Sequence, residues 1–419
     1  MRPIGIIISV FVVLKLVLLF FPHVPVWDET VFLGMGTHIA QGSALYEPFR
    51  PPLLPLLLAP FSFLAPTPYI IIAELLVLAM SAGALFFSWR LAKDIVSEEA
   101  ATYATLFLAI TPIFFHHSTF ILTSIPALFF GLVAINYSKT SPLLAGVAAA
   151  CAFLTRFPAG LFFGGIMIAL LLEKRRKDWF ILCMSFGIVS LLGLGIHANI
   201  AGTNLIEPLL SASIHQNNVV HDSPFYYYVL FFFITMPLLL FAFFAEIPWK
   251  KHMSYVLPFL LSFVYFSLII NKQGRFALLF LPLFALGAGK FFSDHKRYRW
   301  LMLILLLPGL YGMGASIHER MTNNTPDAYS DVAPLLADYV YISEPHLAFY
   351  APGHTYLPTY FYFEYLEEEF INASTGDQFF IVEYPYPCTA CTKEAFFTKL
   401  RQEHTLLYEK GIYRLYEKR

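Results

Sequence analysis

Charged residues are scarce in this chain. Asp, Glu, Lys and Arg make up 13% of the 419 residues, against about a quarter in an average soluble protein. The net charge is −1, and the few basic residues are clustered along the sequence rather than spread. The composition therefore gives no global basic surface, and it argues against nucleic acid as a partner.

Cysteine is also rare, with four in the whole chain. Cys388 and Cys391 lie in a polar C-terminal stretch, where their spacing predicts a small disulfide loop in an oxidising compartment. Cys151 and Cys183 lie in apolar runs and are expected to be packing residues. A zinc site at the C-terminal pair is disfavoured, because two further soft ligands would be needed.

Apolar residues dominate what is present. Hydrophobic residues make up 58% of the chain and aromatic residues 17%, and the mean hydropathy is +0.64. The apolar runs recur at membrane-spanning length, roughly 20 residues each. The sequence predicts a polytopic α-helical membrane protein with about eleven transmembrane helices, near residues 4–21, 69–90, 100–116, 120–137, 142–155, 157–172, 179–199, 226–246, 253–270, 276–291 and 299–316.

The distribution of Lys and Arg predicts the orientation of these spans. With the N-terminus inside, most basic clusters between the spans face the cytoplasm, as the positive-inside rule requires. Four cations face outward against this bias: Arg50, Arg156, Lys272 and Arg275. Each could simply extend to lipid headgroups. A guanidinium or ammonium at this boundary could also bind a lipid-linked phosphate.

A long first outer loop is predicted over residues 22–68. Its segment 51–61 is apolar, but it is short and carries four prolines. Counting it as a span would turn the basic run 174–177 outward, so we expect a re-entrant or surface-lying segment. The first span is expected to stay as an anchor, because no small-residue cleavage site precedes Pro22.

The acidic pair Asp28-Glu29 lies at the start of this loop, before a helix-like run over residues 31–36. Two adjacent carboxylates at a membrane surface suggest acid–base chemistry. The alternative is an interfacial helix cap, because Asp is a good N-cap and Glu suits a first helical turn. The pair alone does not decide between these interpretations.

The composition turns polar from about residue 317. Strand-like stretches at 339–343, 379–383 and 411–416 and an amphipathic helix at 393–403 predict a small α/β domain over residues 317–419, on the extracytoplasmic side. About a hundred residues suffice for a modest core of this kind. The remaining residues, 1–316, form the predicted transmembrane domain.

Several short motifs occur in a characteristic order: Trp27-Asp28-Glu29-Thr30, Arg50-Pro51-Pro52, Leu154-Thr155-Arg156-Phe157-Pro158 and Lys272-Gln273-Gly274-Arg275-Phe276. Together with the spans, they resemble the C-type (GT-C) glycosyltransferases of the protein-mannosyltransferase and aminoarabinose-transferase superfamily. The resemblance covers residues 1 to about 316. It implies an enzyme that moves a sugar from a polyprenyl- or dolichyl-phosphate carrier to a protein, lipid or glycan acceptor.

The resemblance also implies roles for individual residues. Asp28 would be the general base that takes the acceptor proton, and Glu29 would support it or orient the acceptor. Arg156, Lys272 and Arg275 would offset the charge of the departing polyprenyl phosphate. Arg50 stands where many relatives have His, so it could contact the donor or only lipid. Direct displacement would invert the anomeric centre.

A divalent metal cation is a further implied cofactor, because relatives often place an Asp after the third span. The aligned position here looks like Ser124, and His116 and His117 lie nearby on the outer side. The two histidines could ligate a metal with Asp28; interfacial histidines are otherwise structural. The sequence leaves the metal undecided.

A membrane transporter or flippase of a lipid-linked glycan is the alternative function. Transport favours ionisable residues near the bilayer midplane and paired repeats. The predicted span interiors are poor in charge, with Glu74 an exception, and no duplication is evident. The sequence has no phosphate-cradling Gly-rich loop, which disfavours a nucleotide-sugar donor. The outer side would be extracytoplasmic at a prokaryotic plasma membrane, or lumenal in a eukaryotic endoplasmic reticulum.

Overall fold

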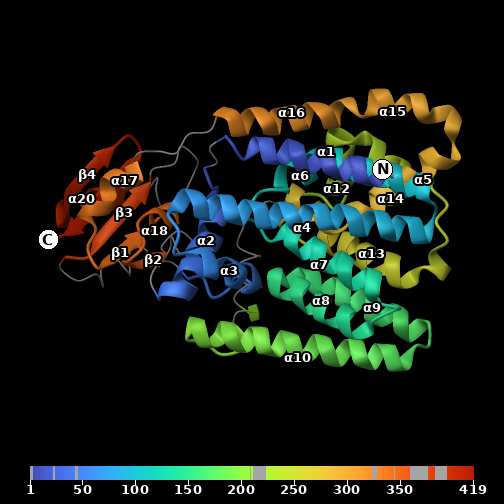
Figure 1. The fold of residues 1–419 in the computed structure, drawn as a ribbon. Helices are drawn as coiled ribbons and strands as arrows, with labels where there is room; N and C mark the ends of the chain where they lie inside the picture. The colour runs from blue at the N-terminus through green and yellow to red at the C-terminus, as the bar shows by residue number, and fades with distance from the viewer. Residues whose placement is uncertain are drawn as a thin grey trace. The chain divides into compact units, whose positions relative to one another are not determined.

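The computed structural model of the chain is mainly helical, with one five-stranded sheet (Figure 1). It describes residues 3–419 except 22–23, 43–45, 208, 211–222, 323–327, 344, 359–375 and 383–393. Two compact units are distinguished: the first comprises Met1–His23, Pro48–Leu54 and Ile71–Asn323, and the second comprises Val24–Glu47, Pro55–Ile70 and Asn324–Arg419. Cys388 and Cys391 lie outside the described residues.

The first unit is a bundle of apolar helices. Among the described residues, three helical stretches are long and apolar enough to cross a membrane: Pro66–Ile95 (α4), Arg176–Ala201 (α10) and Lys296–Thr322. The last of these comprises η6 (Lys296–Tyr298), α15 (Arg299–Leu305) and α16 (Leu307–Thr322). Shorter helices make up most of the rest: α1 (Pro3–Leu18), α5 (Glu98–Ile110), α6 (Pro112–His117), α7 (Ser124–Tyr137), α8 (Pro142–Thr155), α9 (Gly160–Leu172), α12 (Tyr227–Thr235), α13 (Met253–Leu268) and α14 (Leu281–Asp294).

Several predicted spans are divided where proline interrupts the helix. The span expected at 226–246 ends as an α-helix before Met236 and continues from Pro237 as the 3₁₀ helix η3 (Pro237–Phe244). The span expected at 100–116 is broken between α5 and α6 at Pro112. Proline has no N–H to donate and fixes its own φ, so the regular ladder stops there.

Glycine lets pairs of helices in the bundle pack closely, as is common in membrane proteins. A Cβ on Gly289 of α14 would lie 2.4 Å from the Ala100 carbonyl oxygen of α5. A Cβ on Gly146 of α8 would lie 2.5 Å from the Leu182 carbonyl oxygen of α10. Both glycines are therefore required by the spacing of the helix pairs that they join.

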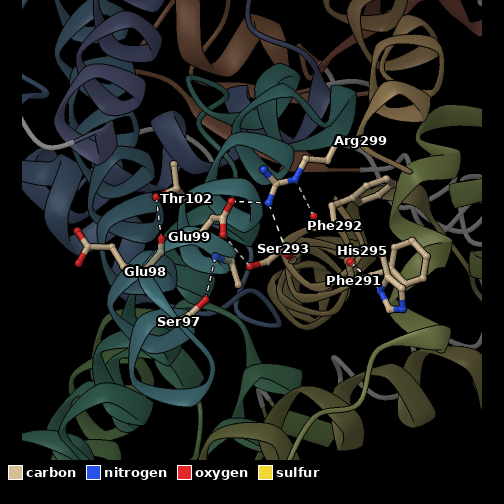
Figure 2. Close-up of polar contacts among 10 residues, drawn as sticks. Ser97, Glu98, Glu99, Thr102, Phe291, Phe292, Ser293, His295 and Arg299 are labelled. Atoms are coloured by element: carbon tan, nitrogen blue, oxygen red, sulfur yellow. Dashed lines mark hydrogen bonds and ion pairs between the residues drawn. The ribbon is translucent and has the colours of Figure 1, made fainter. Parts of the chain in front are cut away.

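The α5–α14 pair is also joined by polar contacts at one end (Figure 2). Ser97 caps α5 by accepting a hydrogen bond from the Ala100 amide at 3.2 Å. Arg299 of α15 links the two helices. Its guanidinium pairs with Glu99 of α5, and its Nε donates to the Phe292 carbonyl of α14 at 3.1 Å.

Other basic clusters expected at the cytoplasmic face also meet one another. The Lys139 ammonium lies 2.9 Å from the Glu173 carboxylate, and Arg175 donates to the Lys139 carbonyl at 2.8 Å. Arg90 stacks on Tyr137, with its guanidinium 5.3 Å from the ring centroid. Basic residues from separate loops thus lie together at one end of the bundle, and the side of the membrane that they face stays a prediction.

The second unit contains the mixed sheet, in the order β2-β1-β3-β5-β4. The first three strands in this order are parallel, and β5 is antiparallel to both β3 and β4. β3 is buried along its whole length, as expected for a central strand. The strands are β1 (Tyr339–Ile342), β2 (Thr355–Pro358), β3 (Gln378–Val382), β4 (His404–Lys410) and β5 (Tyr413–Lys418).

The predicted last strand at 411–416 begins too early. Gly411 has φ +60° and forms, with Ile412, the two-residue loop between β4 and β5. Such hairpin loops favour glycine at a positive φ. The amphipathic helix expected at 393–403 is α20 (Glu394–Glu403), whereas β2 and β4 were not predicted.

The second unit also includes the helix that carries the acidic pair. This helix, α2 (Trp27–Gln41), packs on α18 (His346–Tyr350). The predicted surface segment at 51–61 forms the short α3 (Leu53–Leu58) and the 3₁₀ helix η1 (Ala59–Phe61). The domain boundary expected near residue 317 stays a prediction.

Candidate functional site

Glu29 closes the first turn of α2. The N-cap of this helix is Val26, and the Glu29 carboxylate accepts a hydrogen bond from the Val26 amide at 2.8 Å. Glu29 is fully buried. The interpretation of Asp28 as the N-cap was wrong, because the helix begins one residue before Asp28. The capping role belongs to Glu29, three residues after the cap, where a Glu side chain can reach back.

Asp28 is half-buried in the first turn of α2. Backbone N–H groups at a helix start favour a negative charge there, which stabilises the ionised carboxylate. The position of the helix is fixed within the second unit. The Tyr69 hydroxyl donates to the Leu33 carbonyl at 3.2 Å, and the His346 imidazole contacts the Pro25 carbonyl at 3.0 Å. Asp28 is therefore held on a well-anchored turn.

Arg156 lies at the break between α8 and the 3₁₀ helix η2 (Phe157–Ala159) of the first unit. Its guanidinium donates to the Ser124 hydroxyl at 3.0 Å and stacks on Phe276, 4.5 Å from the ring centroid. Ser124 is the position where the resemblance leads one to expect an acidic residue. A hydroxyl in its place orients the guanidinium without neutralising its charge.

Arg275 lies next to this stacked ring, in the 3₁₀ helix η5 (Gly274–Leu279). Its Nε donates to the Gln273 side-chain oxygen at 2.6 Å, and the Tyr228 hydroxyl donates to the Gln273 carbonyl at 3.3 Å. The structure therefore brings the motif at 272–276 together with Arg156 through Phe276. Tyr228 supports this motif, and it was not among the site residues predicted from the sequence.

Lys272 has a different environment from the two arginines. Its side chain is 6% exposed, and its ammonium donates to the Ile269 carbonyl at 2.6 Å and the Ser223 carbonyl at 2.7 Å. Ile269 is the C-cap of α13, so the ammonium satisfies a carbonyl that the helix leaves open. These contacts give Lys272 a structural role, and its predicted phosphate contact stays a prediction.

Arg50 is half-buried in the first unit, with its guanidinium 5.8 Å from the Phe49 ring centroid. The neighbouring Pro48 carbonyl contacts the His197 imidazole of α10 at 2.7 Å. This contact fixes the chain just before Arg50. A role for Arg50 in donor binding stays a prediction.

The histidines of α6 have other contacts in the structure, and their metal role with Asp28 stays a prediction. The His116 Nδ1 atom lies 3.2 Å from the Ser316 hydroxyl and 3.9 Å from the Glu319 carboxylate. The His117 ring is buried against Phe120. Within the described ranges, no three His, Cys, Asp or Glu side chains converge as metal ligands. We therefore derive no chemical step through a metal.

Three buried charged residues of the first unit were not assigned a role from the sequence. Glu74 of α4 forms a forked ion pair with Arg320 of α16, whose Nε also donates to the Leu18 carbonyl at 2.9 Å. Lys15 of α1 is 3% exposed and lies 3.9 Å from the Phe115 ring centroid. Lys15 was detectable as the single charged residue of the first apolar run.

Comparison with known proteins gives similarity in structure only. No protein-family model and no curated protein matches the sequence. The structure of ArnT from Cupriavidus metallidurans bound to undecaprenyl phosphate matches with a TM-score of 0.68 at 12% identity, over 97% of each chain. The chain has the C-type glycosyltransferase fold.

A second match supports the same fold. The archaeal oligosaccharyltransferase AglB from Archaeoglobus fulgidus, in complex with an inhibitory peptide and a dolichol-phosphate, matches with a TM-score of 0.55 at 14% identity. The match covers 85% of this chain and 64% of AglB. The predicted C-type glycosyltransferase fold is thus confirmed, whereas the count of about eleven spans and the extracytoplasmic C-terminal domain stay predictions.

Proposed function

We propose that this protein is an inverting glycosyltransferase that uses a polyprenyl-phosphate-linked sugar as donor. The observation that carries the proposal is the meeting of Arg156 with the motif at 272–276, in a chain that has the C-type glycosyltransferase fold. The two matched proteins were solved with undecaprenyl phosphate and with a dolichol-phosphate. A lipid-linked phosphate is therefore the ligand we assign to the two arginines.

The proposed reaction is a single displacement. The acceptor oxygen or nitrogen forms a bond to the anomeric carbon, and the bond from that carbon to the phosphate oxygen breaks. Asp28 takes the acceptor proton. Arg156 and Arg275 offset the negative charge that develops on the leaving phosphate, for which the guanidinium fork is well suited.

Glu29 and Lys272 act indirectly in this proposal. Glu29 fixes the first turn of α2 and hence the position of the Asp28 carboxylate. Lys272 holds the end of α13 next to the motif that contains Arg275. The acceptor is a protein, lipid or glycan on the extracytoplasmic or lumenal side of the membrane.

Sugar transfer from a panel of radiolabelled polyprenyl-phosphate sugars tests the proposal. The purified protein is reconstituted in liposomes with candidate acceptors, and both the labelled product and the released polyprenyl phosphate are measured. Equal amounts of product and released carrier phosphate are expected with one donor. Movement of an intact lipid-linked sugar between leaflets, with no release of carrier phosphate, would instead show a flippase.

A further inference from the structure

Lys15 is a buried cation without an acidic partner. It stands in α1 among apolar residues and is 3% exposed. In the parts of the chain that the structure describes, its ammonium forms no hydrogen bond or ion pair, only the contact with the Phe115 ring. A charge inside a membrane-spanning segment is costly and commonly marks a functional site. The position of Lys15 therefore needs an explanation.

The nearby carboxylate of Glu74 does not provide this explanation. Both of its oxygens bind the guanidinium of Arg320, which neutralises that pair. A protonated Lys15 therefore has no carboxylate of its own among the described residues of this part of the bundle. A buried charge is stable only when an opposite charge or several hydrogen bonds compensate it.

The imidazole of His117 lies close to the same charge. His117 is 8% exposed, and its Nδ1 atom is buried without a hydrogen-bond partner among the described residues. His117 lies in α6, which packs on η5, and Lys15 contacts Phe115 of the same helix. Arg156 stacks on Phe276 of η5, and Arg275 lies in η5 itself. Lys15, Arg156 and Arg275 come from α1, from the break after α8 and from η5. Basic groups from three distant parts of the sequence therefore converge around one buried ring.

We propose that Lys15 and His117 bind the phosphate of the polyprenyl carrier together with Arg156 and Arg275. An anion at this place would supply the opposite charge that Lys15 lacks and an acceptor for an imidazole N–H. The proposal rests on the proposed function, because it assigns further ligands to the same donor phosphate. It adds Lys15, to which the sequence analysis assigned no role, and it gives His117 a role other than that of a metal ligand.

The charge of the site has a consequence for the reaction. The phosphodiester of the donor carries one negative charge, whereas a phosphate monoester carries about −1.5 to −2 near neutral pH. A site with two guanidinium groups and an ammonium binds the monoester more tightly than the diester. It therefore stabilises the charge that develops on the leaving phosphate, and we expect the released carrier to inhibit the enzyme.

Binding of undecaprenyl phosphate to Lys15→Met tests the proposal. Methionine keeps the length of the side chain and its packing on Phe115, and it removes the charge. The full-length protein is placed in phosphatidylcholine nanodiscs and titrated with undecaprenyl phosphate, with uncharged polyprenol or with phosphatidylglycerol. Lys93→Met is the matched control. Lys93 lies in the last turn of α4, far along that helix from Glu74, and it pairs with Glu98.

We expect Lys15→Met to bind undecaprenyl phosphate about tenfold or more weakly than the wild type, with polyprenol binding unchanged and with Lys15→Arg within about threefold of the wild type. Unchanged binding by Lys15→Met, while Arg156→Ala loses it, would overturn this inference and leave the proposed function standing. A wild-type protein that does not distinguish undecaprenyl phosphate from polyprenol would overturn both. Equal competition by phosphatidylglycerol would reassign the site to lipid headgroups.

Discussion

The ion pair between Glu74 and Arg320 offers a quantitative test of how the bundle is held together. Glu74 is 1% exposed and Arg320 8%, so both charges are removed from water. Removing one partner of a buried pair leaves an uncompensated charge and costs about 3–5 kcal/mol. Replacing both partners by apolar residues of similar volume is often neutral or stabilising.

We therefore expect Glu74→Leu and Arg320→Leu each to destabilise the first unit by about 3–5 kcal/mol. The double variant is expected to lose much less than the sum of the two. Arg320 also donates to the Leu18 carbonyl, so Arg320→Leu should be the more damaging single change. The coupling energy follows from the double-mutant cycle.

Thermal unfolding of the purified variants in the same detergent measures these effects. The pair between Lys93 and Glu98 is a matched control, because its side chains are 36% and 49% exposed and such pairs contribute about 0–1 kcal/mol. A double variant at Glu74 and Arg320 that loses as much as both single variants together would refute the reasoning. The two residues would then contribute independently.

Three further predictions concern the site, the bundle and the sheet. Arg156→Lys keeps the charge but loses the fork and the stacking, and we expect about tenfold weaker donor binding, seen as a raised KM; an unchanged KM would count against the assignment. Gly289→Ala should destabilise by about 1–3 kcal/mol, because its Cβ would meet backbone atoms of α5, whereas Gly164→Ala, with nothing within 4 Å, should not. Burial, reinforced by the Lys418 charge, lowers the pKa of His404. The neutral ring is thus favoured in the folded state, and thermal stability should fall as the pH drops below about 6.5; His404→Leu should lose that dependence.

The sequence predicted the class of fold because its signals are local. Apolar runs indicate helices in a membrane protein without knowledge of tertiary contacts, whereas the side of each loop, inferred from Lys and Arg, stays a prediction. The breaks at Met236 and Pro112 shifted the helix bounds, since a proline ends a regular ladder even where hydropathy stays high. The strand β4 was missed because most of its residues are exposed, Leu406 and Leu407 among them, and they do not alternate between apolar and polar.

Individual side chains of the site were harder to predict than the fold. Arg156 and Arg275 could be predicted as site residues because each is a cation in a loop predicted to face outward, where Lys and Arg are rare. It could not show that Lys272 binds two carbonyls, or that Glu29 binds the Val26 amide, since both depend on local geometry. Lys15 was overlooked although it is the single charged residue of the first apolar run; its contact with Phe115 could not be read from the sequence.

The role of Asp28 as general base is the central claim. Sugar transfer from the active polyprenyl-phosphate donor is measured in membranes with wild-type protein, Asp28→Asn and Asp28→Glu at matched expression. Asn keeps the size of the side chain but cannot accept the proton, so we expect transfer to fall by about 10²–10⁴-fold, with donor binding retained. Equal transfer by Asp28→Asn and the wild type would contradict the account.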